Sequence, residues 1–195
     1  MTKLATTLDE TPVFIPAGEN HLFGVYTRPT VQAKGVAVIL LAGGIFRLSI
    51  GRNGYTVRLA RALAAAGYHS LRIDVHGVGE STGEVEVYRL DNPLLPDFNA
   101  SVDWVRQQGI NRFILVGSCF GGRMCLAGAA GIDALEAVAL FSVPVIDWER
   151  GSRDHRKGAD LSTSRFVKRA TRNRHCCRQA QSAGLADRLE LGETL

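Results

Sequence analysis

Apolar runs and helical stripes alternate along the first 150 positions of the chain. The unbroken apolar run 36–41 is typical of a strand that is covered on both faces, as in a parallel sheet. Tyr55, Leu59 and Leu63 recur at helical spacing, and Gly67 ends that stripe. A second helical stripe ends at Gly109. The whole pattern predicts strands at 13–15, 22–26, 36–41, 69–75, 112–117 and 135–143, and helices near 53–66, 94–108 and 119–130. We therefore expect an α/β fold with a mostly parallel sheet of about six strands and helices on both faces.

The pattern stops near residue 150. Leu, Ile, Val and Phe make up 15 of the 40 residues from 110 to 149, but only 7 of the 46 from 150 to 195. The second share, about 15%, lies below the level of roughly 20% that a segment needs to bury a core. We expect residues 1–149 to form an incomplete domain whose C-terminal strands are missing, and residues 150–195 to form a basic, poorly structured or lid-like segment. A truncated chain, or a shifted reading frame past residue 150, would explain the change.

The chain has a net charge of +4, which on its own would suggest nucleic-acid binding. The distribution of the charge along the chain argues against this interpretation. Residues 1–149 carry 12 basic and 14 acidic side chains, a net of −2, whereas residues 150–195 carry 11 and 5, a net of +6. The positive excess lies in the C-terminal segment, so we expect no nucleic-acid partner. The longest apolar run, 35–46, is too short for a membrane span, and the first ten residues hold no apolar signal segment. These features favour the cytoplasm.

The four cysteines do not have the pattern of a disulfide framework. They are Cys119, Cys125, Cys176 and Cys177, of which the last two are adjacent, and this arrangement favours a reducing compartment. His175 beside the adjacent pair lacks further ligands at metal-binding spacing, so we expect neither a metal nor a cofactor.

The residues after the predicted strand 112–117 have the pattern of a nucleophile elbow. Gly117-Ser118-Cys119-Phe120-Gly121-Gly122 joins a buried strand to a helix, with small residues on either side of Cys119. Such a turn holds its middle residue in a strained conformation, and a Cβ at Gly117 or Gly121 would strike the turn's own backbone. The helix N-terminus places N–H groups where an oxyanion would form. The pattern predicts Cys119 as the nucleophile. Ser118 lies one position early, and the structural alternative is a small core cysteine.

Three motifs in this order resemble the α/β-hydrolase superfamily over roughly residues 11–149. Leu41-Ala42-Gly43-Gly44-Ile45 is similar to the superfamily's oxyanion loop, and Asp-Val-His-Gly-Val-Gly-Glu-Ser at 74–81 is similar to the turn after its fourth strand. The segment 117–122 is similar to its elbow in the cysteine form, as in dienelactone hydrolases. The flanking residues look more like bacterial serine-aminopeptidase-like and exosortase-associated hydrolases.

This resemblance implies a hydrolase that acts on a small ester, thioester or lactone. Cys119 would attack the carbonyl carbon and form an acyl-enzyme that water or another acceptor resolves. The backbone N–H groups of Phe120 and of Gly44 or Ile45 would form the oxyanion hole.

The acid and the base of such a site are harder to find. In the superfamily the acid follows the sixth or seventh strand and the histidine follows the eighth, but the last strand predicted here is the sixth. The acids after it are Asp147, Glu149, Asp154, Asp160, Asp187, Glu190 and Glu193, and the histidines are His155 and His175. Asp147 is the best-placed acid, and His155 ranks above His175 because its loop could fold back over the elbow. His76 precedes the elbow and is expected to hydrogen-bond locally. The alternative is a non-catalytic or defective hydrolase-like domain without acid and base.

Overall fold

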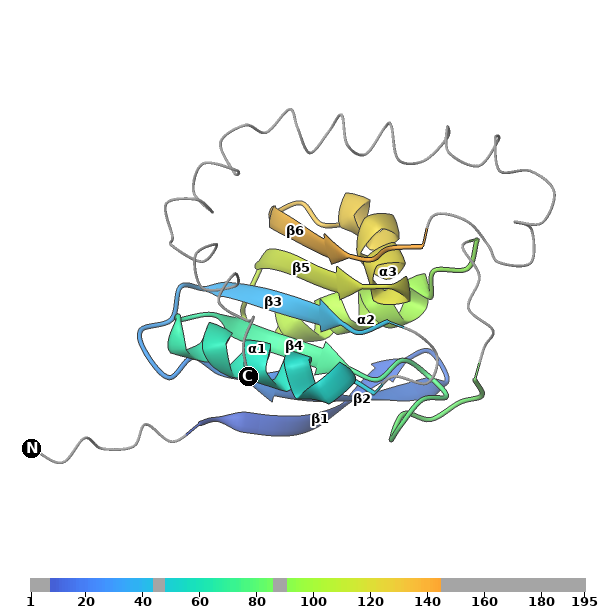
Figure 1. The fold of residues 1–195 in the computed structure, drawn as a ribbon, viewed down its shortest axis with the longest axis horizontal. Coiled ribbons are helices and arrows are strands. Elements are labelled where there is room, and N and C mark those ends of the chain that lie inside the picture. Colours follow the sequence, from blue (N-terminus) through green and yellow to red (C-terminus); the bar gives the residue numbers. More distant parts are fainter. Residues whose placement is uncertain (1–7, 44–47, 86–90, 145–195) are drawn as a thin grey trace, which may run out of the picture. The chain divides into compact units, whose positions relative to one another are not determined.

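The computed structural model describes residues 8–43, 48–85 and 91–144, all within one compact unit, Met1–Asp147. These residues form a six-stranded sheet in the order β1-β2-β4-β3-β5-β6 (Figure 1). The β2 strand is antiparallel to both β1 and β4, whereas β4, β3, β5 and β6 run parallel to one another. The strands are β1 (Glu10–Ala17), β2 (Asn20–Thr27), β3 (Val36–Leu41), β4 (His69–Ile73), β5 (Arg112–Ser118) and β6 (Leu135–Phe141).

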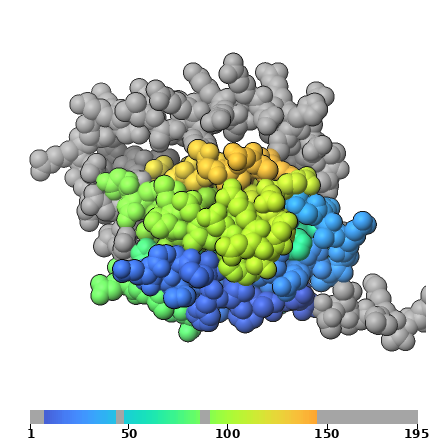
Figure 2. Space-filling view, turned by 180° about the vertical axis from the view of Figure 1, so that it is seen from behind, coloured from blue at the N-terminus to red at the C-terminus, as the bar shows by residue number. Residues whose placement is uncertain are grey.

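Helices cover both faces of the sheet. Figure 1 shows the face of the sheet that carries α1. Figure 2 shows the opposite face, where the yellow-green atoms of α2 lie in front of the sheet. Val38 and Leu40 of β3 pack against Ala60 of α1. They share one face of the sheet because successive side chains of a strand point to opposite faces. The helices are α1 (Tyr55–Ala65), α2 (Leu95–Gln107) and α3 (Phe120–Gly128), with short 3-10 turns at η1 (Arg52–Gly54) and η2 (Ala129–Gly131).

The strand order determines where a ligand can meet the sheet. From β3 the chain crosses through α1 to β4, then returns through α2 to β5 on the other side of β3, and continues through α3 to β6. Because such crossovers are right-handed, α1 lies on one face and the other two helices lie on the opposite face. The loops after β3 and β5 therefore leave neighbouring strands towards opposite faces. This is the position at which open α/β sheets bind ligands.

The predicted fold class is confirmed, and each predicted element appears within a few residues of its expected place. The strands β4 and β6 end two residues earlier than the hydrophobic pattern suggested. Gly67 and Gly109, which were expected to end helices, have φ angles of +88° and +83°, a conformation that glycine adopts at little steric cost. Among the described helices, none has both the length and the apolar character needed to cross a membrane. The predictions for residues 150–195 lie outside the described residues.

Candidate active site

Cys119 occupies the sharp turn between β5 and α3, with φ 52° and ψ −125°. Side-chain-bearing residues rarely adopt this conformation, which costs on the order of 1–3 kcal/mol. Backbone hydrogen bonds hold the residue on both sides. The Cys119 N–H donates to the Phe141 carbonyl oxygen at 2.8 Å, and the Gly122 N–H donates to the Cys119 carbonyl oxygen at 3.0 Å. The predicted elbow is confirmed, with the thiol of Cys119 at its apex.

Glycines provide the space that this turn needs. A Cβ on Gly117 would lie 2.6 Å from the Gly121 carbonyl oxygen, so the predicted clash within the turn is confirmed. The nearest obstacle to a Cβ on Gly121 is the Leu41 carbonyl oxygen at 2.2 Å, which belongs to β3 rather than to the turn. A Cβ on Gly43 would lie 2.2 Å from the Cβ of Cys119. The start of the loop after β3 is therefore packed directly against the apex of the elbow.

The α1 face of the elbow is occupied by Tyr55, the first residue of that helix. Its hydroxyl shares a hydrogen bond with Ser118 Oγ, at 2.7 Å between the oxygens. Ser118 ends β5 one position before the strained residue, and its hydroxyl is engaged by this tyrosine. These positions favour Cys119 over Ser118 as the nucleophile.

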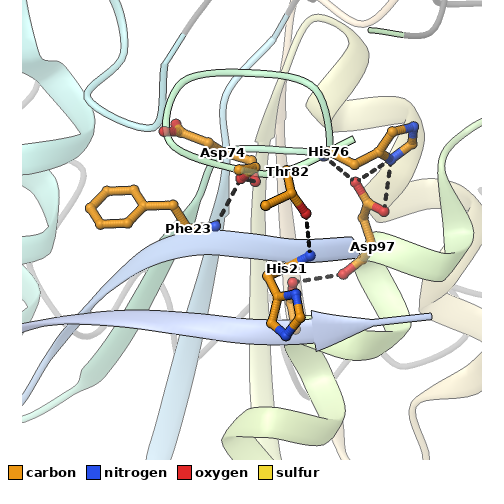
Figure 3. A network of polar contacts seen from close by, with 8 residues as sticks. His21, Phe23, Asp74, His76, Thr82 and Asp97 are labelled. Carbon is orange, nitrogen blue, oxygen red and sulfur yellow. Dashed lines mark hydrogen bonds and ion pairs between the residues drawn. The ribbon is translucent and has the colours of Figure 1, made fainter. Parts of the chain in front are cut away.

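Hydrogen bonds join the turn after β4 to β2 (Figure 3). A further bond joins this turn to the loop after β3. Asp74 is buried and accepts a hydrogen bond from the Ser49 N–H. Gly79 approaches so closely that a Cβ on it would lie 2.2 Å from Asp74 Oδ2. The Ser81 hydroxyl donates to the Asp74 carbonyl oxygen and accepts from the Phe23 N–H, both at 2.8 Å. Residues 74–81 therefore shape the turn after β4, and the carboxylate of Asp74 holds the loop after β3.

His76 in the same turn pairs with Asp97, which lies near the start of α2 (Figure 3). The imidazole Nδ1 lies 2.9 and 3.0 Å from the two carboxylate oxygens, and the His76 backbone N–H donates to Asp97 Oδ2 at 2.8 Å. His76 is hydrogen-bonded as the sequence predicted, but its partner belongs to a helix rather than to its own loop. The pair fixes the turn to α2.

The two described cysteines differ in their surroundings. Cys119 is partly exposed and stands immediately before the first residue of α3. Cys125 is buried, and burial raises the pKa of its thiol to about 12. It follows that Cys125 is an inert core residue, whereas the thiol of Cys119 is accessible to solvent.

Four of the predicted site residues lie outside the described residues: Gly44, Ile45, Asp147 and His155. Of the predicted oxyanion donors, only Phe120 is described, as the first residue of α3 immediately after Cys119. Within 8–43, 48–85 and 91–144, no group of three or more His, Cys, Asp or Glu side chains could hold a metal ion.

The chain matches the family model described as X-Pro dipeptidyl-peptidase (S15 family) over residues 20–186. The protein belongs to this family. The S15 family uses a serine nucleophile, so the thiol at the apex of the elbow is a departure from the family pattern.

Similar proteins support the same fold. An acyl transferase of Photobacterium leiognathi is 30% identical over 125 residues, which are 61% of this chain and 37% of that protein. The structure of an α/β serine hydrolase without a lid from Xanthomonas campestris matches with a TM-score of 0.58 and 22% identity, over 74% of this chain and 66% of the other. An esterase of Pyrococcus furiosus matches with a TM-score of 0.59 and 19% identity, over 74% and 56%. The chain thus spans about a third of the length of the curated relative and about two thirds or less of these structures.

The sequence pattern alone does not identify two residues of the candidate site, Tyr55 and Asp97. Tyr55 was recognised only as part of a helical stripe, and Asp97 was not noted at all. The contacts of both join distant parts of the chain, with a sequence separation of 63 for Tyr55 and Ser118 and of 21 for His76 and Asp97. The available signal was a tyrosine at the very start of the helix that follows the predicted oxyanion loop, because the N-termini of such helices meet the elbow at the carboxyl edge of the sheet.

Proposed function

We propose that the protein hydrolyses or transfers the acyl group of a small ester, thioester or lactone through Cys119. The observation that carries this proposal is the strained conformation of Cys119 at the junction of β5 and α3, with the loop after β3 packed against its Cβ. A protein maintains such strain where a reactive side chain must project from the end of a sheet.

The chemistry follows from the position of the thiolate. Its sulfur attacks the carbonyl carbon, a C–S bond forms, and the carbonyl oxygen takes the negative charge next to the Phe120 N–H. Collapse of this intermediate breaks the bond to the alcohol or thiol, which leaves with the proton that the Cys119 thiol gave up when the thiolate formed. Water then attacks the thioester, breaks the C–S bond and releases the acid and the free thiol. Gly44 or Ile45 as the second oxyanion donor, Asp147 as the acid and His155 as the base belong to this proposal.

The relatives suggest the substrate class. The S15 family is described by a peptidase activity, one relative is named an acyl transferase and one structural neighbour an esterase. All three reactions transfer an acyl group after a nucleophile adds to its carbonyl carbon. A thiolate is intrinsically a better nucleophile than a hydroxyl group and depends less on a general base, which favours activated acyl groups such as thioesters and aryl esters over amides.

The test is a pre-steady-state burst with p-nitrophenyl acetate. The wild type is expected to release about one equivalent of p-nitrophenolate per active chain before the slower steady state, because acylation precedes hydrolysis of the thioester. Cys119→Ala is expected to lose the burst. Cys125→Ala is the matched control, since it removes a buried thiol from the same region and should keep the burst.

Two results would oppose the proposal. An equal burst in the wild type and in Cys119→Ala would exclude this thiol as the nucleophile. The absence of any burst in a folded wild type, with thioester as well as aryl ester substrates, would favour a non-catalytic hydrolase-like domain. A burst that persists in His155→Ala would remove His155 from the proposed site and leave the role of Cys119 intact.

A further inference from the structure

The elbow needs support beyond its own backbone. A strained φ and ψ pair persists only where the surrounding structure holds it, because the residue would otherwise relax to an ordinary conformation. On the β6 side, the Phe141 carbonyl oxygen accepts the Cys119 N–H. On the α1 side, the contact comes from Tyr55, whose hydroxyl meets Ser118 Oγ one residue before the apex.

Tyr55 is itself confined by the loop that precedes α1. Gly51, with φ +65°, lies so close beneath the ring that a Cβ on it would be 2.5 Å from Tyr55 Cε1. The next residue of the helix, Thr56, donates its hydroxyl proton to the Ser49 carbonyl oxygen. The Ser49 N–H in turn donates to the buried carboxylate of Asp74. The phenol hydroxyl is therefore held in place by the turn after β4, through the loop 48–54.

These contacts form one continuous path from the Asp74 turn through the loop after β3 to Ser118. We propose that Tyr55 is a positioning residue for the nucleophile: its hydrogen bond to Ser118 holds the end of β5, and thereby keeps the Cys119 sulfur above the N-terminus of α3. This inference rests on the proposed role of Cys119. Tyr55 acts on that residue through Ser118 and does not take part in the bond changes.

The consequence is a specific effect of the phenol hydroxyl on the reactivity of Cys119. Without the hydrogen bond, the turn can relax towards ordinary dihedral angles, and the sulfur then spends less time in the projecting position that the strained turn gives it. Tyr55→Phe removes the hydroxyl and keeps the ring on Gly51. One hydrogen bond corresponds to a change of ~2–10-fold in a rate or equilibrium.

The experiment measures the rate of iodoacetamide alkylation at Cys119 by mass spectrometry of its peptide, at pH 7.5 and in the full chain. Tyr55→Phe and Ser118→Ala are each expected to slow alkylation ~2–10-fold, and the double variant to be no slower than either single one, because both remove the same hydrogen bond. Tyr26→Phe is the matched control. It removes a phenol hydroxyl with a 2.7 Å hydrogen bond, to His69, at a site that packs against Trp104 of α2. It should leave the alkylation rate unchanged even where it lowers the melting temperature.

Alkylation does not require hydrolase activity, so this readout is independent of the proposed function. An alkylation rate in Tyr55→Phe equal to or faster than that of the wild type overturns the positioning role, as does a double variant whose slowing is the product of the two single effects. Where the ester burst is present, Tyr55→Phe is further expected to lower kcat by a similar factor with little change in KM. Absence of both a burst and steady-state turnover, with thioester as well as aryl ester substrates, refutes the proposed hydrolase activity, and the alkylation rates still decide the role of Tyr55.

Discussion

Gly117→Ala is expected to lower the free energy of unfolding by more than the addition of a methyl group at a surface site would. The added Cβ would lie 2.6 Å from the Gly121 carbonyl oxygen, 2.6 Å from the Gly122 Cα and 2.7 Å from the Cys125 sulfur, whereas ordinary contacts are 3.4–4 Å. Two of these three atoms are backbone and the third belongs to a buried side chain, so none can move aside alone. Overpacking of this kind costs about 1–3 kcal/mol or more. We expect a value near the upper end, which corresponds to a fall in the melting temperature of roughly 5–15 °C.

The assay is thermal unfolding followed by circular dichroism, with urea unfolding as a second measure of the free energy. Gly131→Ala is the matched control, because no atom lies within 4 Å of the position of its added Cβ and its φ is not in the left-handed region. That variant should melt within about 2 °C of the wild type, as surface substitutions usually do. If Gly117→Ala also melts within this margin, the elbow is looser than its contacts indicate, and the argument from close packing is refuted.

Two further predictions follow from pKa values. Burial raises the pKa of Cys125 to about 12, so iodoacetamide at pH 8 should label this thiol only after unfolding; labelling of the native protein as fast as at the apex thiol would contradict its burial. The pKa of His69 is lowered from 6.5, first by burial and then by the charge of Arg28. The unfolded state therefore binds the proton more readily, and the contribution of His69 to stability is full above pH 6.5 and is lost as the pH falls through the lowered folded-state value. The melting temperature should fall between pH 7 and pH 5, and His69→Gln should reduce that fall; an equal fall in both proteins would show that other groups are responsible.

The elements could be predicted because their signals are local. The run 36–41 is apolar at every position, and all six of its residues are buried in β3. Gly67 and Gly109 ended their helices as predicted, because a left-handed residue after a helix is a property of a few neighbouring residues. The elbow was predictable for the same reason, since six consecutive residues contain the strand end, the apex and the small flanking positions.

The contacts that hold the elbow could not be predicted, because they join segments far apart in the chain. The obstacle beside Gly121 is the carbonyl oxygen of Leu41, which becomes its neighbour only once β3 and β5 pair. The pairing of His76 with Asp97 likewise depends on where α2 packs against the turn after β4. Periodicity places residues on a face of a helix or strand, but it does not specify which side chains meet across two elements. The assignments of Asp147 and His155 stay predictions, since both lie outside the described residues.

The thiol at the apex is compatible with membership of a family that uses serine, because the elbow is a property of the backbone. The elbow is defined by the dihedral angles of Cys119, by the contact of Gly43 with its Cβ and by the hydrogen bond from its N–H to β6. None of these features involves an atom of the side chain beyond Cβ. A hydroxyl and a thiol would therefore project from the same place, next to the same helix N-terminus. They differ in what else they need: a hydroxyl requires a base to remove its proton, whereas a thiolate is present in part without one. In the proposed mechanism, a cysteine at position 119 would thus use the same elbow as a serine while depending less on the proposed acid and base, Asp147 and His155.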